Sequence, residues 1–228
     1  MSVFNIGNNS PEWVSYLLSF LLLLLGAGLA FLSQFIFERK RNRERNRRHA
    51  WSLLHTLQSL VEDLISLDSM RTESLEMAKA KNREDEAFWQ KWQERIGYGD
   101  PGIRFSADEL IILSSMHDNQ FTTKVREVEN AHRILVQSAQ KLSELRTAMG
   151  EHCTAVGKDG TLVTMNPPPR ALPILTKLDS LGESFQKALP GAVSDAKLVA
   201  TQLGPRLKKH YRLKKFATLD YSRINPPF

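Results

Sequence analysis

An all-α fold is predicted for this chain of 228 residues: one transmembrane helix followed by a cytoplasmic helical bundle. Two observations lead to this prediction. The stretch Trp13–Phe37 has 25 residues without a charge, and roughly 20 apolar residues suffice for a helix to cross a bilayer. After it, apolar residues recur at intervals of three and four through long segments without glycine or proline, as on one face of a helix. One short departure is predicted, a small β-hairpin near residues 154–163.

The uncharged stretch 13–37 is interpreted as a permanent transmembrane helix. At about 1.5 Å per residue it reaches about 37 Å, which is enough to span a bilayer with some tilt. A cleavable signal peptide would carry positive charge before a shorter apolar region, whereas residues 1–12 contain neither Lys nor Arg. We therefore expect the stretch to be retained. Residues 1–12 are predicted to form a short extracytoplasmic tail, on the basis of the orientation argued next.

Seven cations follow this stretch directly, accompanied by two glutamates. They are Arg39, Lys40, Arg41, Arg43, Arg45, Arg47 and Arg48. Lys and Arg beside a span are retained on the cytoplasmic side, so we expect the N-terminus outside and residues 38–228 inside. Such a run can contact anionic lipid headgroups, or it can bind nucleic acid through phosphate. Its position directly at the predicted bilayer favours the lipid interpretation.

A second basic segment lies near the C-terminus, within a chain of formal net charge +6. We call it the basic strap: Arg206, Lys208, Lys209, Arg212, Lys214 and Lys215. It is interleaved with Tyr211, Phe216 and Tyr221, a mixture that also occurs in proteins that stack on single-stranded nucleic acid. Confinement of the basicity to two segments favours a body held near an anionic surface, and we expect the strap to contact lipid headgroups or an acidic partner.

Residues 38–96 are predicted to form a basic juxtamembrane segment and a long helix. No glycine or proline occurs between Gly28 and Gly97, so the transmembrane helix is predicted to continue into the cytoplasm. Its apolar positions have the spacing of a heptad seam: Leu53, Leu57, Leu60, Leu64 and Leu67. We expect this interaction seam to pair as a coiled coil with another subunit, although packing within the chain is the alternative. Phe88, Trp89 and Trp92 are predicted to dock the polar segment that follows.

Residues 103–228 are predicted to form a separate helical domain. Ser106 and Glu109 have capping-box spacing at a helix start. Residues 117–120 are expected to break or kink the next stretch, after which a regular helical period runs from Phe121 to Met149, with Gly150 as the stop.

Two further helices are predicted after the proline-rich segment 166–170. The third covers Leu172–Leu189, and the fourth begins near Pro190 or Gly191 and runs to about Tyr211. Pro205 is expected to end or kink the fourth helix, because proline lacks a backbone N–H and clashes with the preceding turn.

Residues that could carry chemistry do not combine into a recognised site. Glu129 and His132 lie one helical turn apart, but a di-iron bundle needs a second such motif, so His132 is interpreted as a seam residue and Glu129 as solvent-facing. Cys153 is the single cysteine, so an intramolecular disulfide is excluded, as fits a reducing cytosol. We expect its thiol to be inert. Residues 157–160 lack phosphate-loop spacing. We therefore expect no catalytic, cofactor or metal site, and we do not expect the protein to be an enzyme.

The sequence thus predicts a single-pass membrane protein whose cytoplasmic helical domain mediates protein–protein interaction, as a scaffold, tether or regulatory subunit. Its expected partners are anionic membrane lipid and either a second copy or a helical protein; nucleic acid is not expected. Two alternatives stay open. One is an oligomeric membrane effector with a cytosolic sensing bundle, and the other is a membrane-tethered nucleic-acid binder.

Overall fold

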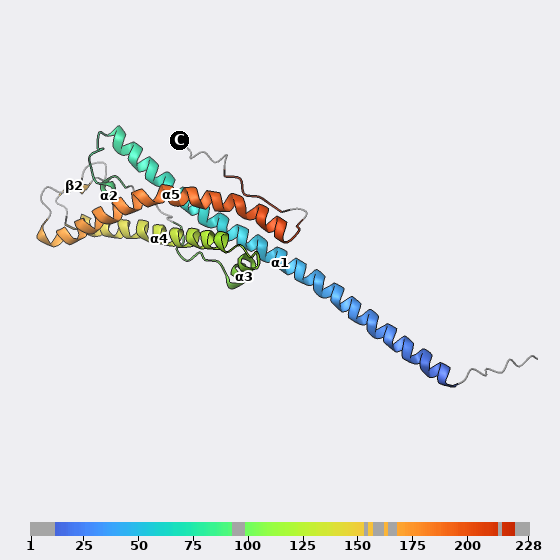
Figure 1. Cartoon of the computed structure of the whole chain (residues 1–228). Coiled ribbons are helices and arrows are strands. Elements are labelled where there is room, and N and C mark those ends of the chain that lie inside the picture. Colours follow the sequence, from blue (N-terminus) through green and yellow to red (C-terminus); the bar gives the residue numbers. More distant parts are fainter. Residues whose placement is uncertain are drawn as a thin grey trace, which may run out of the picture. The chain divides into compact units, whose positions relative to one another are not determined.

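The computed structural model describes residues 12–92, 99–152, 155–156, 162–163, 168–213 and 216–221, and it confirms the all-α fold (Figure 1). The chain divides into two compact units, Met1–Arg48 and His49–Phe228. This division differs from the predicted one. Within the predicted segment 38–96, residues 49–80 belong to the same unit as residues 103–228, whereas residues 38–48 belong to the first unit.

A single helix, α1, runs from Glu12 to Ala80. The predicted continuity of the apolar stretch with the following helix is therefore confirmed, as expected for 68 residues without glycine or proline. In the first unit, the apolar side chains from Tyr16 to Phe37 are exposed. The helix is long and apolar enough there to cross a membrane.

The second unit is a helical bundle with its own core. Its long helices are the part of α1 after Arg48, α4 (Asn119–Gly150) and α5 (Leu172–His210), and α5 packs along α4 (Figure 1). Shorter elements connect them: α2 (Phe88–Lys91), α3 (Ala107–Ser115) and the 3-10 turn η1 (Pro169–Ala171). The predicted hairpin is present as β1 (Ala155–Val156) paired antiparallel with β2 (Leu162–Val163).

The leucine seam of α1 lies inside this bundle. Leu53, Leu57, Leu60, Leu64 and Leu67 are all fully buried in one hydrophobic core with residues of α4 and α5. The expectation that this seam pairs with another subunit is therefore wrong for this structure. A heptad pattern specifies an apolar stripe of the right width but not the origin of its partner, and here helices of the same chain cover it.

A capping box begins α3 and also joins it to α1. The Ser106 side chain accepts a hydrogen bond from the Glu109 backbone amide, and the Ser106 amide donates to the Glu109 carboxylate at 2.7 Å. The same carboxylate is buried and accepts bonds from the hydroxyls of Ser52 at 2.7 Å and Thr56 at 2.9 Å. The predicted cap is thus confirmed, and its glutamate also fixes α3 against α1.

The predicted break between α3 and α4 is confirmed. α3 ends at Ser115, His117 has a positive φ of 54°, and Asp118 caps α4 by accepting a bond from the Phe121 amide at 3.0 Å. The apolar period of α4 faces the core, and α4 ends at Gly150 as predicted.

The third and fourth predicted helices are one helix. α5 continues through both Pro190 and Pro205, which lie on its exposed side. A proline inside a helix costs about 3 kcal/mol. Buried residues on either side of Pro190, including Phe185, Leu189 and Val193, hold the helix against the core across the interruption.

The docking role predicted for the aromatic residues after α1 is confirmed. Phe88, Trp89 and Trp92 are buried, and the Trp92 ring meets Phe185 of α5 edge-on, with 5.3 Å between ring centroids. The Trp89 indole N–H donates to the Asp179 carboxylate at 2.7 Å. The polar segment after α1 is thereby fastened to α5.

Candidate functional site

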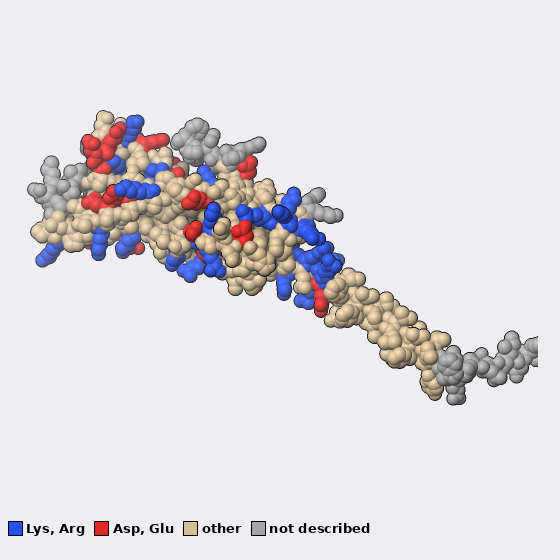
Figure 2. All heavy atoms as spheres, viewed as in Figure 1, with Lys and Arg blue, Asp and Glu red and all other residues tan. Residues whose placement is uncertain are grey.

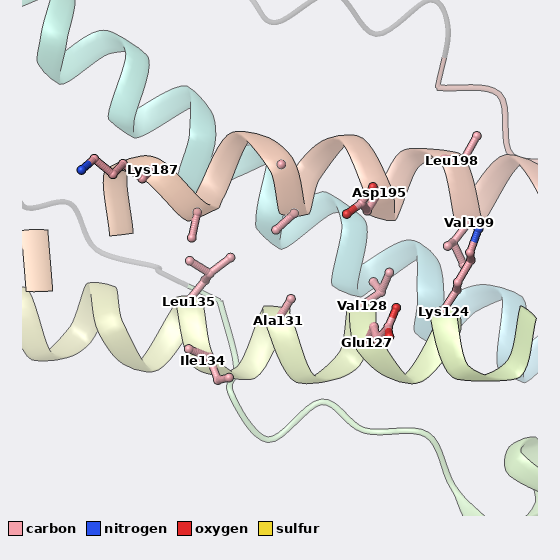
Figure 3. A pocket seen from close by; sticks show the side chains of 13 residues that line it. Lys124, Glu127, Val128, Ala131, Ile134, Leu135, Lys187, Asp195, Leu198 and Val199 are labelled. Atoms are coloured by element: carbon pink, nitrogen blue, oxygen red, sulfur yellow. The ribbon is translucent and has the colours of Figure 1, made fainter. Parts of the chain in front are cut away.

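A groove of about 640 Å³ lies between α4 and α5 on the surface of the second unit (Figure 3). Val128 and Leu135 of α4 and Val199 of α5 form part of its floor, where they are also members of the core. Ile134 and Leu198 line it as well, and each is 50% exposed. The groove therefore presents apolar surface that no described residue covers.

Small residues explain why the two helices leave a hollow here. Ala131 of α4 and Ala188, Gly191 and Ala192 of α5 line its middle. A Cβ added at Gly191 would meet no atom within 4 Å. Facing small side chains cannot fill the space between two helices, so the groove has room for larger side chains of another molecule.

Charged side chains of both signs surround the apolar floor. In Figure 3, Lys187 stands at one end and Lys124 at the other, with Glu127 and Asp195 between them, nearer to Lys124. Lys187 forms an exposed ion pair with Glu183, with 2.5 Å between its Nζ and the carboxylate, and this lysine lowers the pKa of Glu183.

The chemistry of the groove fits binding better than catalysis. Its lining is mainly aliphatic, and the four charged residues, Lys124, Glu127, Lys187 and Asp195, surround the apolar floor. Within the part of the chain that the structure describes, no three His, Cys, Asp or Glu side chains are placed to hold a metal ion. An apolar floor between charged rims matches the apolar face of an amphipathic helix.

The seven juxtamembrane cations are exposed on α1 in the first unit: Arg39, Lys40, Arg41, Arg43, Arg45, Arg47 and Arg48. Their side chains are thus free of the bundle core. The interaction seam, in contrast, is in the core and cannot serve as a free binding surface.

The basic strap is divided by the structure. Arg206 pairs with Asp118, and its guanidinium lies 4.2 Å from the centre of the Phe121 ring. Lys208, Lys209 and Arg212 are exposed, whereas Lys214 and Lys215 lie outside the described residues. Arg206 is therefore part of the contact between α5 and α4, and the strap is not one continuous free surface.

The aromatic residues interleaved with the strap pack against the domain. The Tyr211 hydroxyl shares a hydrogen bond of 2.6 Å with the Ser115 hydroxyl, and Tyr221 is buried. The rings of Phe216 and Trp51 are in contact, with 4.8 Å between their centroids. Tyr221 is thus inside the domain, and Tyr211 and Phe216, which are partly buried, are held by contacts within it.

The Glu129 and His132 pair is separated by its contacts. The His132 side chain is fully buried in the α4 stripe as predicted, and its Nε2 lies 2.9 Å from Asp63 Oδ2 of α1. The prediction that Glu129 faces solvent is wrong, because it is half-buried and accepts a bond from the Phe105 amide at 3.0 Å. The interpretation of Cys153 concerns a residue outside those that the structure describes.

Sequence reasoning missed the groove. A usable signal was present, because Ile134 and Leu198 are large apolar residues that fall outside the buried stripes of their helices. The small residues opposite them, however, resemble ordinary helix-forming or turn positions until α4 and α5 are placed side by side.

Comparison of the chain with models of protein families, with curated proteins and with solved structures finds no match.

Proposed function

We propose that this protein is a single-pass, membrane-anchored docking protein, and that the α4/α5 groove binds an amphipathic helix of a partner protein. The open groove carries the proposal, because none of the described residues covers its apolar surface, whereas the leucine seam of α1 is buried in the core. The fully exposed apolar part of α1 supports the anchoring. In this arrangement the partner is recruited to the cytoplasmic face of a membrane.

The geometry of the groove supports a helix as its occupant. α4 and α5 are adjacent helices with small residues in the middle of their open face, and a third helix packed there would complete a bundle layer. Large apolar residues of the ligand, spaced by three and four, would fill the space over Gly191 and Ala131.

The rim charges define the complementary pattern. A ligand helix with an acidic residue facing Lys187 and a basic residue facing Glu127 and Asp195 would match the groove in one direction and not in the reverse. The apolar floor supports affinity, and these exposed charges support orientation.

A groove-filling substitution tests the proposal. Photoreactive residues at Ile134 and Leu198 of the full chain, expressed in its membrane, should cross-link to the same protein segment, and that segment should have an amphipathic helical pattern. Gly191→Leu should lower this cross-linking by roughly tenfold or more, because the added side chain occupies the groove. Gln137→Leu, at an exposed α4 position that does not line the groove, should leave it unchanged.

Folding does not confound this comparison. A Cβ at position 191 meets no atom within 4 Å, and replacing a helical glycine gains up to about 1 kcal/mol of stability. Equal cross-linking in Gly191→Leu and in the unchanged protein would refute the groove as the binding site.

A further inference from the structure

One end of the second unit gathers the beginning of its α1 segment, α3 and the end of α5. Ser52 of α1 donates to Glu109 of α3 at 2.7 Å, and Tyr211 bonds Ser115 at 2.6 Å. The ring of Trp51 contacts Phe216. We call this region the His49 end and define it as residues 49–56, α3, residues 208–212 and Phe216.

The exposed charge of the His49 end is mainly positive. Lys208, Lys209 and Arg212 are exposed, and the structure pairs none of them with an acidic side chain among the described residues. The acidic groups here are Glu109, which is buried, and Asp108, which lies 3.8 Å from His49. Figure 2 shows Lys and Arg interspersed with Asp and Glu over the visible face of the second unit.

Two large apolar side chains are exposed at the same end. Trp51 is 40% exposed and Ile111 is 64% exposed. Tryptophan is among the residues enriched at membrane interfaces, where its amphipathic ring lies at the level of the headgroups. Exposed cations beside exposed apolar groups are the combination that binds anionic bilayer surfaces.

The length of the chain keeps this end close to any bilayer that holds residues 13–37. Only residues 38–48 separate the uncharged stretch from His49, and as a helix they rise about 18 Å. The headgroup region adds roughly 5–8 Å to each side of the hydrocarbon core. This short connection limits how far the His49 end can lie from such a bilayer, and attraction between exposed cations and anionic lipid acts over about one Debye length at physiological salt.

We propose that the His49 end is a second membrane contact, which docks on anionic lipid through Lys208, Lys209 and Arg212 with Trp51 and Ile111 in the interface. The inference rests on the proposed anchoring and deepens it, because docking would orient the domain on the bilayer. Lipid is preferred over nucleic acid since Tyr211, Phe216 and Tyr221 are occupied by contacts within the domain.

Lipid-quenched fluorescence on the full chain tests this contact. The chain with Cys153→Ser and Ile111→Cys carries a fluorophore and is incorporated into nanodiscs of phosphatidylcholine alone or mixed with phosphatidylglycerol. Headgroup-labelled quencher lipids should quench the label in the anionic discs and not in the neutral ones. A label at Leu172→Cys, at the opposite end of α5, should not be quenched in either.

Charge neutralisation supplies the matched control. Changing Lys208, Lys209 and Arg212 to Gln should lower the ratio of docked to undocked protein on the order of 100-fold. Changing three exposed lysines away from this end, Lys79, Lys141 and Lys177, to Gln gives the same net charge and should leave quenching intact.

Each other outcome has a definite meaning. Incorporation without quenching, or equal loss in both triple variants, would overturn the lipid contact alone. Failure of the chain to incorporate would refute the anchoring and this inference together. A response of the label to added duplex DNA at physiological salt, in place of the response to anionic lipid, would overturn it in favour of nucleic acid.

Discussion

At the scale of single residues, one contact between a buried histidine and a partly exposed aspartate joins α1 to α4. His132 Nε2 lies 2.9 Å from Asp63 Oδ2, and the histidine side chain is fully buried. Gly99 closes over the aspartate: its φ is 92°, and an added Cβ would lie 2.5 Å from the same carboxylate oxygen. A buried polar group without a partner costs about 1–3 kcal/mol, so this contact favours one register of the two helices.

Tyr221 gives a prediction at the same scale. Burial, followed by the negative charge of Glu62, raises its pKa to about 12, compared with about 10 for an unfolded tyrosine. The fold therefore favours the protonated phenol. Its contribution to stability is fully present below pH 10 and is lost as pH rises through about 12. The urea concentration at the midpoint of unfolding of residues 49–228 should therefore fall between about pH 8 and about pH 11. In Tyr221→Phe this decrease should be smaller.

The same substitution should cost little at neutral pH. The Tyr221 hydroxyl is buried without a hydrogen-bond partner among the described atoms, so its removal should change stability by less than about 1 kcal/mol or stabilise the domain. Tyr211→Phe is the control, because it loses the bond to Ser115 and should keep the alkaline dependence. An unchanged pH profile in Tyr221→Phe would contradict the assignment.

At the scale of elements, α5 organises the second unit. It packs along α4, holds α2 through the ring contact of Trp92 with Phe185, and supports the C-terminal segment 216–221 through its last turns. Two buried glycines permit the closest of these approaches. Gly182 faces Trp89, and Gly204 faces the backbone of Ala217 and Thr218.

These glycines should respond oppositely to alanine. A Cβ at Gly204 would lie 2.8 Å from the Ala217 carbonyl oxygen and 3.1 Å from Thr218 Cα, so Gly204→Ala should displace segment 216–221 at a cost of about 1–3 kcal/mol. A Cβ at Gly182 would lie 3.5 Å from its nearest neighbours, which is ordinary contact. Gly182→Ala should therefore be neutral or stabilising by up to about 1 kcal/mol.

Urea unfolding of residues 49–228 and limited proteolysis of the C-terminal segment check this pair. Both variants gain the same helix propensity, so the difference between them isolates the packing against segment 216–221. Equal stability of the two variants would show that segment 216–221 does not pack closely against α5 at Gly204.

Local patterns explain why most elements were predictable. The α4 stripe, the Ser106 cap and the continuity of α1 all follow from spacing and from the absence of helix breakers. The prediction that a helix ends before Pro190 was wrong, because burial of residues on both sides of Pro190 in α5 outweighs the free-energy cost of a proline inside the helix. The partner of the leucine seam, the contact of His132 with Asp63 and the groove around Gly191 depend on which helices become neighbours, and no local signal specifies that.

At the scale of the whole molecule, the chain joins a fully exposed apolar helix to a domain with a complete core. The core residues lie between Ala50 and Tyr221, so the domain needs no contribution from the apolar stretch. The apolar stretch, in turn, has no covering within the chain. This separation supports the proposed membrane anchor and docking domain, and the orientation of that anchor would decide on which side of a membrane the groove lies.

Orientation should depend on the seven cations after Phe37. With no Lys or Arg in residues 1–12 and seven in residues 39–48, a reporter active only in the cytoplasm and fused after Phe228 should be active. Replacing all seven by Gln should give mixed orientation, because the bias of Lys and Arg near a span sets its direction.

The matched control replaces seven exposed cations of the second unit by Gln: Lys124, Arg126, Lys141, Lys177, Lys187, Lys208 and Lys209. It makes the same change in net charge but lies far beyond the roughly 15–20 residues within which this bias acts, so orientation should be retained. Activity of the fusion only with a reporter that works outside the cytoplasm would contradict the proposed orientation and place the groove on the opposite side of the membrane.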